Sequence, residues 1–161
     1  MTLDKCVNND KIRTDDGGSL RYVIEGLIML FLADLKDYTE QEVKQHLSNE
    51  YAGKDGNHGT QNDKGELLKL LDEYNVLVGY ESVGNWGCDS SSYFLLQNKV
   101  TLEYFETSGS HCSCYGFEGQ FYLSPVDVTY LKSDKFYLGC GGYDDDSDEN
   151  RESVKLFLQT L

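Results

Sequence analysis

The stretch that decides the fold runs from residue 76 to residue 107 and reads VLVGYESVGNWGCDSSSYFLLQNKVTLEYFET. It is rich in β-branched and aromatic residues, and apolar side chains alternate over 100–107 in a way compatible with a strand. We therefore predict strands over 76–80, 93–98 and 100–107, separated by a glycine- and serine-rich loop over 83–92.

Shorter elements are predicted around and beyond this stretch. Asn98 and Lys99 would break the last two strands into a hairpin, and further strands are expected over 120–123 and 135–139. Pro125 fits the first turn of a short helix that follows Ser124.

The most apolar part of the chain lies nearer its beginning, over residues 22–35. It is shorter than the about 20 apolar residues that a membrane span needs. Because it is apolar nearly all round, it predicts a helix over 19–37 at the centre of the core, with half of a dimer contact as the alternative.

Three amphipathic segments complete the predicted structure. Thr39 and Glu42 have the spacing of a capping box and predict a helix over 40–50. Further helices are expected over 64–73 and 149–160, and a loop over 52–62. Because helices and strands are segregated, the order predicts one α+β domain spanning 1–161, with N-terminal helices packed on an antiparallel sheet and a C-terminal helix.

The charge balance limits the classes of partner. The chain has 28 Asp and Glu against 14 Lys and Arg, which gives a net charge of −14 at pH 7. Such a charge repels nucleic acid and anionic lipid and attracts basic surfaces. We therefore expect a basic protein as partner, with no direct nucleic-acid binding and no membrane contact. The alternative is an acidic surface that only interacts with solvent.

The cysteines and histidines offer one candidate metal site. His111, Cys112, Cys114 and Cys140 carry the donor types of a structural zinc site. However, a single residue separates Cys112 from Cys114, whereas paired zinc-binding cysteines are two to four residues apart. The sequence therefore favours free thiols and no cofactor, and leaves open a zinc site or a redox pair of Cys112 and Cys114.

The residues around these cysteines resemble a known group. The run CSCYGFEGQF over 112–121, followed by Pro125 and Asp127, resembles small acidic proteins of tailed bacteriophages. The resemblance covers about residues 111–130 and assigns no catalytic residue. It implies an accessory protein that is made by a phage and located in the cytoplasm of its bacterial host.

No catalytic signature occurs in the sequence, so a binding function is expected. We predict a non-enzymatic inhibitor that binds a basic host protein of defence or nucleic-acid handling, of the anti-CRISPR or anti-restriction type, by imitating nucleic acid. The alternatives are a structural or regulatory phage protein that self-associates through the apolar helix, as in a homodimer, and a small zinc or thiol protein. The residues predicted to contact the partner are Glu103, Glu106, Glu118, Tyr143, Asp144, Asp145 and Asp146.

Overall fold

The computed structural model of this chain describes residues 10–12, 21–24, 27–52, 64–84, 89–113, 115–138 and 147–161. Within these ranges, seven strands form one sheet in the order in which they occur along the chain. The strands are β1 (Asp10–Ile12), β2 (Arg21–Ile24), β3 (Leu27–Ala33), β4 (Tyr74–Val83), β5 (Ser90–Asn98), β6 (Tyr104–His111) and β7 (Ser124–Val126). The helices are α1 (Glu40–Tyr51), α2 (Lys64–Leu71), α3 (Val128–Leu131) and α4 (Ser147–Leu158).

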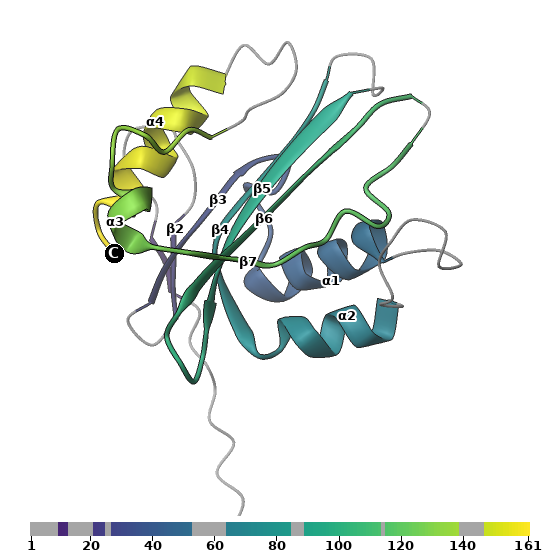
Figure 1. Ribbon diagram of the computed structural model, residues 1–161, viewed down its shortest axis with the longest axis horizontal. Coiled ribbons are helices and arrows are strands. Elements are labelled where there is room, and N and C mark those ends of the chain that lie inside the picture. The colour runs from purple at the N-terminus through teal and green to yellow at the C-terminus, as the bar shows by residue number, and fades with distance from the viewer. Residues whose placement is uncertain are drawn as a thin grey trace, which may run out of the picture.

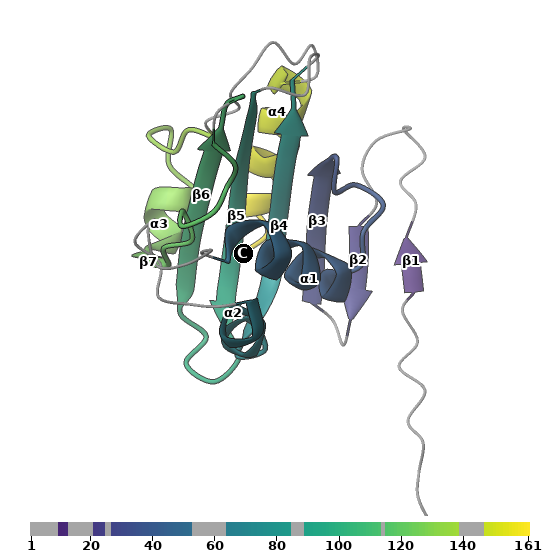
Figure 2. The same ribbon diagram turned by 90° about the vertical axis from the view of Figure 1, so that its right-hand side faces the viewer.

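The sheet is mixed. Strands β3 and β4 are parallel, and every other neighbouring pair is antiparallel. A parallel pair needs a long crossover between its strands, and α1 and α2 lie in that connection. Figure 2 shows the strands side by side, with α1 and α2 in front of the sheet and α4 behind it.

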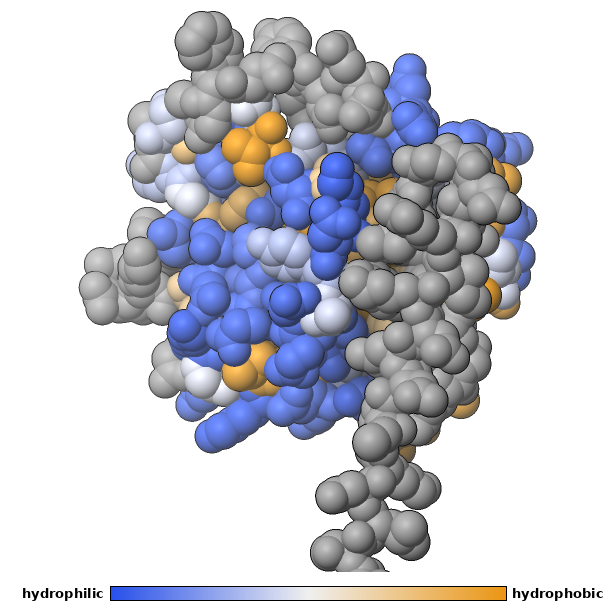
Figure 3. All heavy atoms as spheres, turned by 180° about the vertical axis from the view of Figure 1, so that it is seen from behind, coloured by the Kyte–Doolittle hydropathy of each residue, from blue (hydrophilic) through white to orange (hydrophobic). Residues whose placement is uncertain are grey.

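Helices cover both faces of the central strands (Figure 1). The face towards α1 and α2 buries a core that includes Phe31, Leu47 and Phe94. The opposite face, towards α3 and α4, buries a second core that includes Tyr80 and Phe157. The surface seen from behind is mostly hydrophilic, with hydrophobic residues in small islands (Figure 3).

The predicted helix over 19–37 is wrong, because the described residues there form β2 and β3. In β3, Met29 and Phe31 enter the core beneath α1, whereas Leu30 and Leu32 enter the core beneath α4. A strand that is buried on both faces is apolar at every position, so it lacks the alternation that marks a strand. The alternative of self-association through an apolar helix therefore has no helix to act through in the described residues of this segment.

The α+β class is confirmed, but the arrangement differs from the expected one. Strands come first in the chain, and the sheet contains a parallel pair. The three predicted strands of the deciding stretch correspond to β4, β5 and β6, although β5 begins inside the predicted loop, at Ser90. The predicted helices at 40–50, 64–73 and 149–160 correspond to α1, α2 and α4.

The capping box of α1 forms as predicted. The Oγ1 atom of Thr39 accepts a hydrogen bond from the backbone N–H of Glu42 at 3.3 Å. The Oε2 atom of Glu42 accepts one from the backbone N–H of Thr39 at 2.7 Å. These two contacts satisfy N–H groups at the start of the helix that have no partner within it.

Two predicted strands and one predicted helix start are wrong. Residues 120–123 and 135–138 are irregular, and residue 139 lies outside the described ranges. Pro125 lies in the edge strand β7, and α3 begins after Asp127, whose Oδ1 accepts a hydrogen bond from the N–H of Thr129 at 2.6 Å. Residues 120–123 do not form a strand because Phe121 and Leu123 pack into the α1-side core instead.

Two further points concern the limits of the described chain. Of the predicted loop over 52–62, only Ala52 belongs to the described residues. Among the helices in the described ranges, none is long and apolar enough to cross a membrane.

Candidate functional site

A pocket of about 700 Å³ opens at the β6 side of the sheet, on the face that carries α3. It is bounded by β5, by β6 and by the segments that flank β7 and α3. Its described lining is polar and aromatic and consists of Ser91, Ser92, Tyr93, Glu106, Thr107, Ser108, Gly109, Ser110, Gln120, Tyr122, Ser124, Tyr130, Phe136 and Tyr137.

The pocket exists because β7 covers only the first part of β6, pairing with residues 104–106. The segment that connects β6 to β7 leaves the sheet and passes the end of α1 (Figure 1), where the N–H of Gly119 donates to the carbonyl of Tyr51 at 3.2 Å. Phe121 follows it into the α1-side core. Among the described residues, no strand therefore pairs with the edge of β6 beyond Glu106.

Near the end of β6, the side-chain amide of Gln120 forms hydrogen bonds with this edge. Its Oε1 accepts a hydrogen bond from the N–H of Ser110 at 2.9 Å, and its Nε2 donates to the carbonyl of Ser110 at 2.7 Å. The N–H and C=O groups of Ser110 therefore point away from β5. Since alternate residues of a strand share this direction, the N–H and C=O of Ser108 point to the same side, between the Gln120 amide and β7.

Glu106 is the only charged residue in the described lining. Its Oε2 accepts a hydrogen bond from the hydroxyl of Tyr93 at 3.1 Å. Burial, followed by the charge of Glu106 and this hydrogen bond, raises the pKa of Tyr93, so the phenol stays protonated as a donor. Within the described part of the chain, no cation pairs with Glu106, and its Oε1 accepts no hydrogen bond. The pocket therefore holds an oriented carboxylate with one oxygen available.

Aromatic rings line the same pocket as this carboxylate. Phe136 contacts the rings of Tyr93 and Tyr130 edge to face, with centroids 5.7 Å and 6.0 Å apart. Tyr122 and Tyr137 are more exposed than the buried Tyr93, at 58% and 69%. The guanidinium of Arg151, from α4, lies 5.1 Å from the centroid of the Tyr137 ring. Aromatic faces attract cations, so rings and carboxylate favour the same class of ligand.

No protein-family model, curated protein or solved structure gives a significant match to this chain.

The residues predicted to contact a partner lie in different surroundings. Glu106 lines the pocket, whereas Glu103 lies in the turn before β6 and lines a separate depression with Asp127 and Val128. Glu118 lies in the segment between β6 and β7. Tyr143, Asp144, Asp145 and Asp146 lie outside the described residues.

The candidate zinc ligands are only partly described. His111 packs edge to face against Phe117, with centroids 4.9 Å apart, and Cys112 is an exposed free thiol. Cys114 and Cys140 lie outside the described residues. In the part of the chain that the structure covers, no three His, Cys, Asp or Glu side chains are grouped so that they could hold a metal ion.

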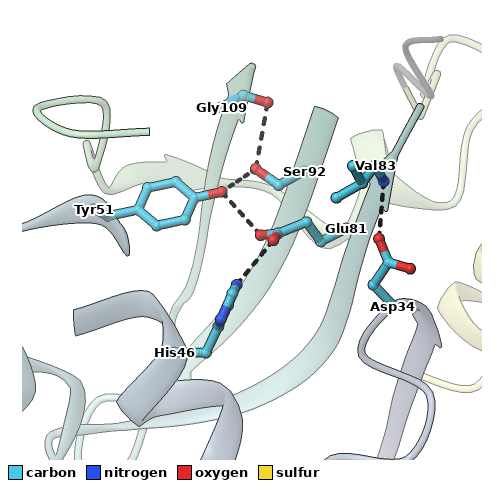
Figure 4. Close-up of polar contacts among 7 residues, drawn as sticks. All are labelled: Asp34, His46, Tyr51, Glu81, Val83, Ser92 and Gly109. Atoms are coloured by element: carbon cyan, nitrogen blue, oxygen red, sulfur yellow. Dashed lines mark hydrogen bonds and ion pairs between the residues drawn. The ribbon is translucent and has the colours of Figure 1, made fainter. Parts of the chain in front are cut away.

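A second polar cluster lies between α1 and the sheet (Figure 4). The Nε2 atom of His46 lies 2.9 Å from Oε1 of Glu81, and the hydroxyl of Tyr51 donates to Oε2 of Glu81 at 3.4 Å. The Tyr51 hydroxyl also forms a hydrogen bond with Ser92, whose Oγ donates to the carbonyl of Gly109 at 3.3 Å. Glu81, Tyr51 and Ser92 are all buried.

Glu81 controls the protonation of this cluster. Burial alone would lower the pKa of His46, but the hydrogen bond and the charge of Glu81, with smaller contributions from Glu50 and Asp34, raise it. Burial and the charge of Glu81 also raise the pKa of Tyr51. Ser92 bonds to Tyr51 and not to His46, so the cluster does not form a serine–histidine nucleophile pair. Its contacts instead join α1 to β4 and β5.

Of the described residues predicted to contact a partner, only Glu106 lines the pocket, and sequence reasoning did not indicate the pocket or the buried cluster. The aromatic lining comes from residues 93, 122, 130, 136 and 137, which the fold brings together from separate segments. The high tyrosine count was the only signal of this surface. His46 and Glu81 are 35 residues apart, and no local pattern connects them.

Proposed function

We propose that this chain is a non-enzymatic binding protein that docks onto a basic protein and holds one of its cationic side chains in the pocket beside Glu106. The observation that carries this proposal is the Glu106 carboxylate, which is oriented by Tyr93, lies in a pocket lined by aromatic rings and is not paired with a cation in the described chain. A cationic side chain would satisfy the carboxylate and the ring faces together.

Two terms would contribute to binding. The net charge of −14 draws a basic protein towards the chain and raises the association rate at low ionic strength. In the pocket, a charge-assisted hydrogen bond to Glu106 contributes about 1.5–3 kcal/mol. A cation over an aromatic ring adds about 0.5–2 kcal/mol. The first term selects the class of partner, and the second fixes where it sits.

The proposed target is a basic host protein that handles nucleic acid or acts in defence. Such proteins carry basic grooves for the phosphate backbone, and an acidic protein seated in the groove would exclude the nucleic acid. The resemblance to acidic phage proteins over residues 111–130 supports a bacterial host as the setting. Inhibition would then follow from occupation of the groove and would need no chemical step.

The test is capture of partners from bacterial lysate on three immobilised forms: wild type, Glu106→Gln and Glu149→Gln. The two variants lose the same charge, but only Glu106 lines the pocket, whereas Glu149 is exposed on α4. We expect specific proteins that bind the wild type and Glu149→Gln at low salt, are released at high salt, and bind Glu106→Gln about tenfold or more weakly. A partner that binds all three forms equally, or that is indifferent to salt, would contradict the proposal.

A further inference from the structure

We infer that the pocket beside Glu106 is an arginine site, which prefers a planar guanidinium over the ammonium of lysine and over a quaternary ammonium. This inference rests on the proposed function and deepens it by naming the side chain that the partner inserts. Three features of the pocket support the choice: its acceptors, its rings and its carboxylate.

The pocket wall offers many hydrogen-bond acceptors. Besides Glu106, its described lining includes the hydroxyls of Ser108, Ser110 and Ser124 and the outward-facing main chain of Ser108. A guanidinium has five N–H donors in one plane, an ammonium has three on a point charge, and a quaternary ammonium has none. A ligand without donors would leave these polar groups desolvated and unpaired, which costs affinity.

The rings favour a flat cation. A guanidinium stacks on an aromatic face and is more weakly hydrated than an ammonium, so it loses less on entering a partly closed pocket. The chain already uses this contact at the pocket rim, where the Arg151 guanidinium lies over the ring of Tyr137. Tyr130, a residue that is 42% exposed, is a second pocket tyrosine within the reach of a ligand.

The carboxylate leaves one oxygen for a donor. Tyr93 occupies Oε2 of Glu106 and leaves Oε1 to a ligand. The carbonyl of Ser108, two residues further along β6, points to the open edge of the strand. Separate acceptors in one pocket suit a donor group that carries several N–H bonds.

The experiment is an NMR titration of the nitrogen-labelled full chain with three probes at constant ionic strength: N-acetylarginine amide, N-acetyllysine amide and tetramethylammonium chloride. We expect saturable shifts at the amides of Glu106, Ser108 and Tyr130, with the arginine probe binding about tenfold tighter than the lysine probe. Glu106→Gln should weaken arginine binding by about tenfold or more, and Glu149→Gln, an exposed position on α4, should leave it unchanged.

A second variant guards against a folding defect in the first. Tyr130→Leu keeps Glu106 but removes one ring, and it should weaken arginine binding about threefold or more. Equal or tighter binding of the lysine or tetramethylammonium probe would overturn the arginine assignment and leave the proposed function standing. Absence of saturable binding of every probe at the pocket would overturn both.

Discussion

At the scale of single residues, Glu81 connects the helix layer to the sheet. It lies on β4, is only 4% exposed, and is hydrogen-bonded by His46 and Tyr51, which both come from α1 (Figure 4). A buried carboxylate is costly unless it is paired, so these two contacts decide whether its burial can be tolerated. The cluster therefore makes the stability of the α1 layer sensitive to protonation.

Replacement of Glu81 by Gln should lower the pKa of His46, since the hydrogen bond and the charge that raise it disappear while the burial that lowers it remains. The measurement is an NMR titration of the His46 ring in both proteins. His111 serves as the internal control, because it is far along the chain and contacts Phe117 instead. An unchanged His46 titration would show that Glu81 does not govern it.

The same pair predicts a pH dependence of stability. The pKa of His46 in the folded chain is raised above its unfolded value of 6.5, so its protonation stabilises the fold fully below that value. This contribution is lost as the pH rises through the raised pKa. We expect the free energy of unfolding of the wild type, relative to Glu81→Gln, to be larger near about pH 6 than near about pH 9 in urea unfolding. A difference that is equal at both pH values would contradict the assignment.

Removal of one buried hydroxyl should also be measurable. Tyr51→Phe leaves Glu81 and Ser92 without one of their hydrogen bonds and should lower the free energy of unfolding by about 1–2 kcal/mol. Tyr122→Phe is the matched control, because that side chain is largely exposed. Urea unfolding of the two variants beside the wild type decides the point, and equal loss in both would argue against the buried cluster.

At the scale of secondary-structure elements, local signals predict an element from the sequence, whereas tertiary contacts leave no local pattern. The Thr39 cap and the spaced leucines of α2 act within a few residues, so the sequence alone predicts both helices. The sequence of β3 instead fits a buried helix, because both faces of this strand are buried, one by α1 and the other by α4. The pocket could not be predicted either, because it depends on where the β6–β7 connection leaves the sheet.

The cap of α1 gives a prediction at this scale. Thr39→Ala removes the oxygen that accepts the Glu42 N–H and should lower the free energy of unfolding by about 1 kcal/mol. Thr39→Ser keeps an oxygen at this position and should stay close to the wild type. Chemical denaturation monitored by circular dichroism provides the comparison, and an Ala variant as stable as the Ser variant would refute the role of the cap.

At the scale of the whole molecule, exposed carboxylates are not confined to one layer. They occur on α1 at Glu42 and Glu50, in the turn before β6 at Glu103, and on α4 at Glu149 and Glu152. Exposed acids therefore lie on several elements of the described molecule. The pocket at Glu106 would give a basic partner a defined place to bind, which dispersed charge does not. Such a charge also opposes the compact state through self-repulsion.

Salt should consequently stabilise the fold. Screening weakens repulsion between exposed like charges, so the urea midpoint should rise with added sodium chloride. Reversal of two exposed acids, Glu50→Lys with Glu103→Lys, adds four charge units to the net charge of −14 and leaves −10. This double variant should show a smaller increase with salt than the wild type. An equal increase in both would indicate that self-repulsion is not the cause.

The proline in the last strand has a consequence for how molecules of this protein meet one another. The N–H groups of Glu106 and Ser110 point away from β5, so the main-chain groups of Phe105, one residue before Glu106, point towards β5. Phe105 is paired with Pro125, and the nitrogen of Pro125 therefore points away from β6, to the free edge of β7. That nitrogen has no hydrogen to donate, and the strand is only three residues long. A second chain therefore finds no continuous ladder to join at this rim, which is how a sheet avoids polymerising into ribbons.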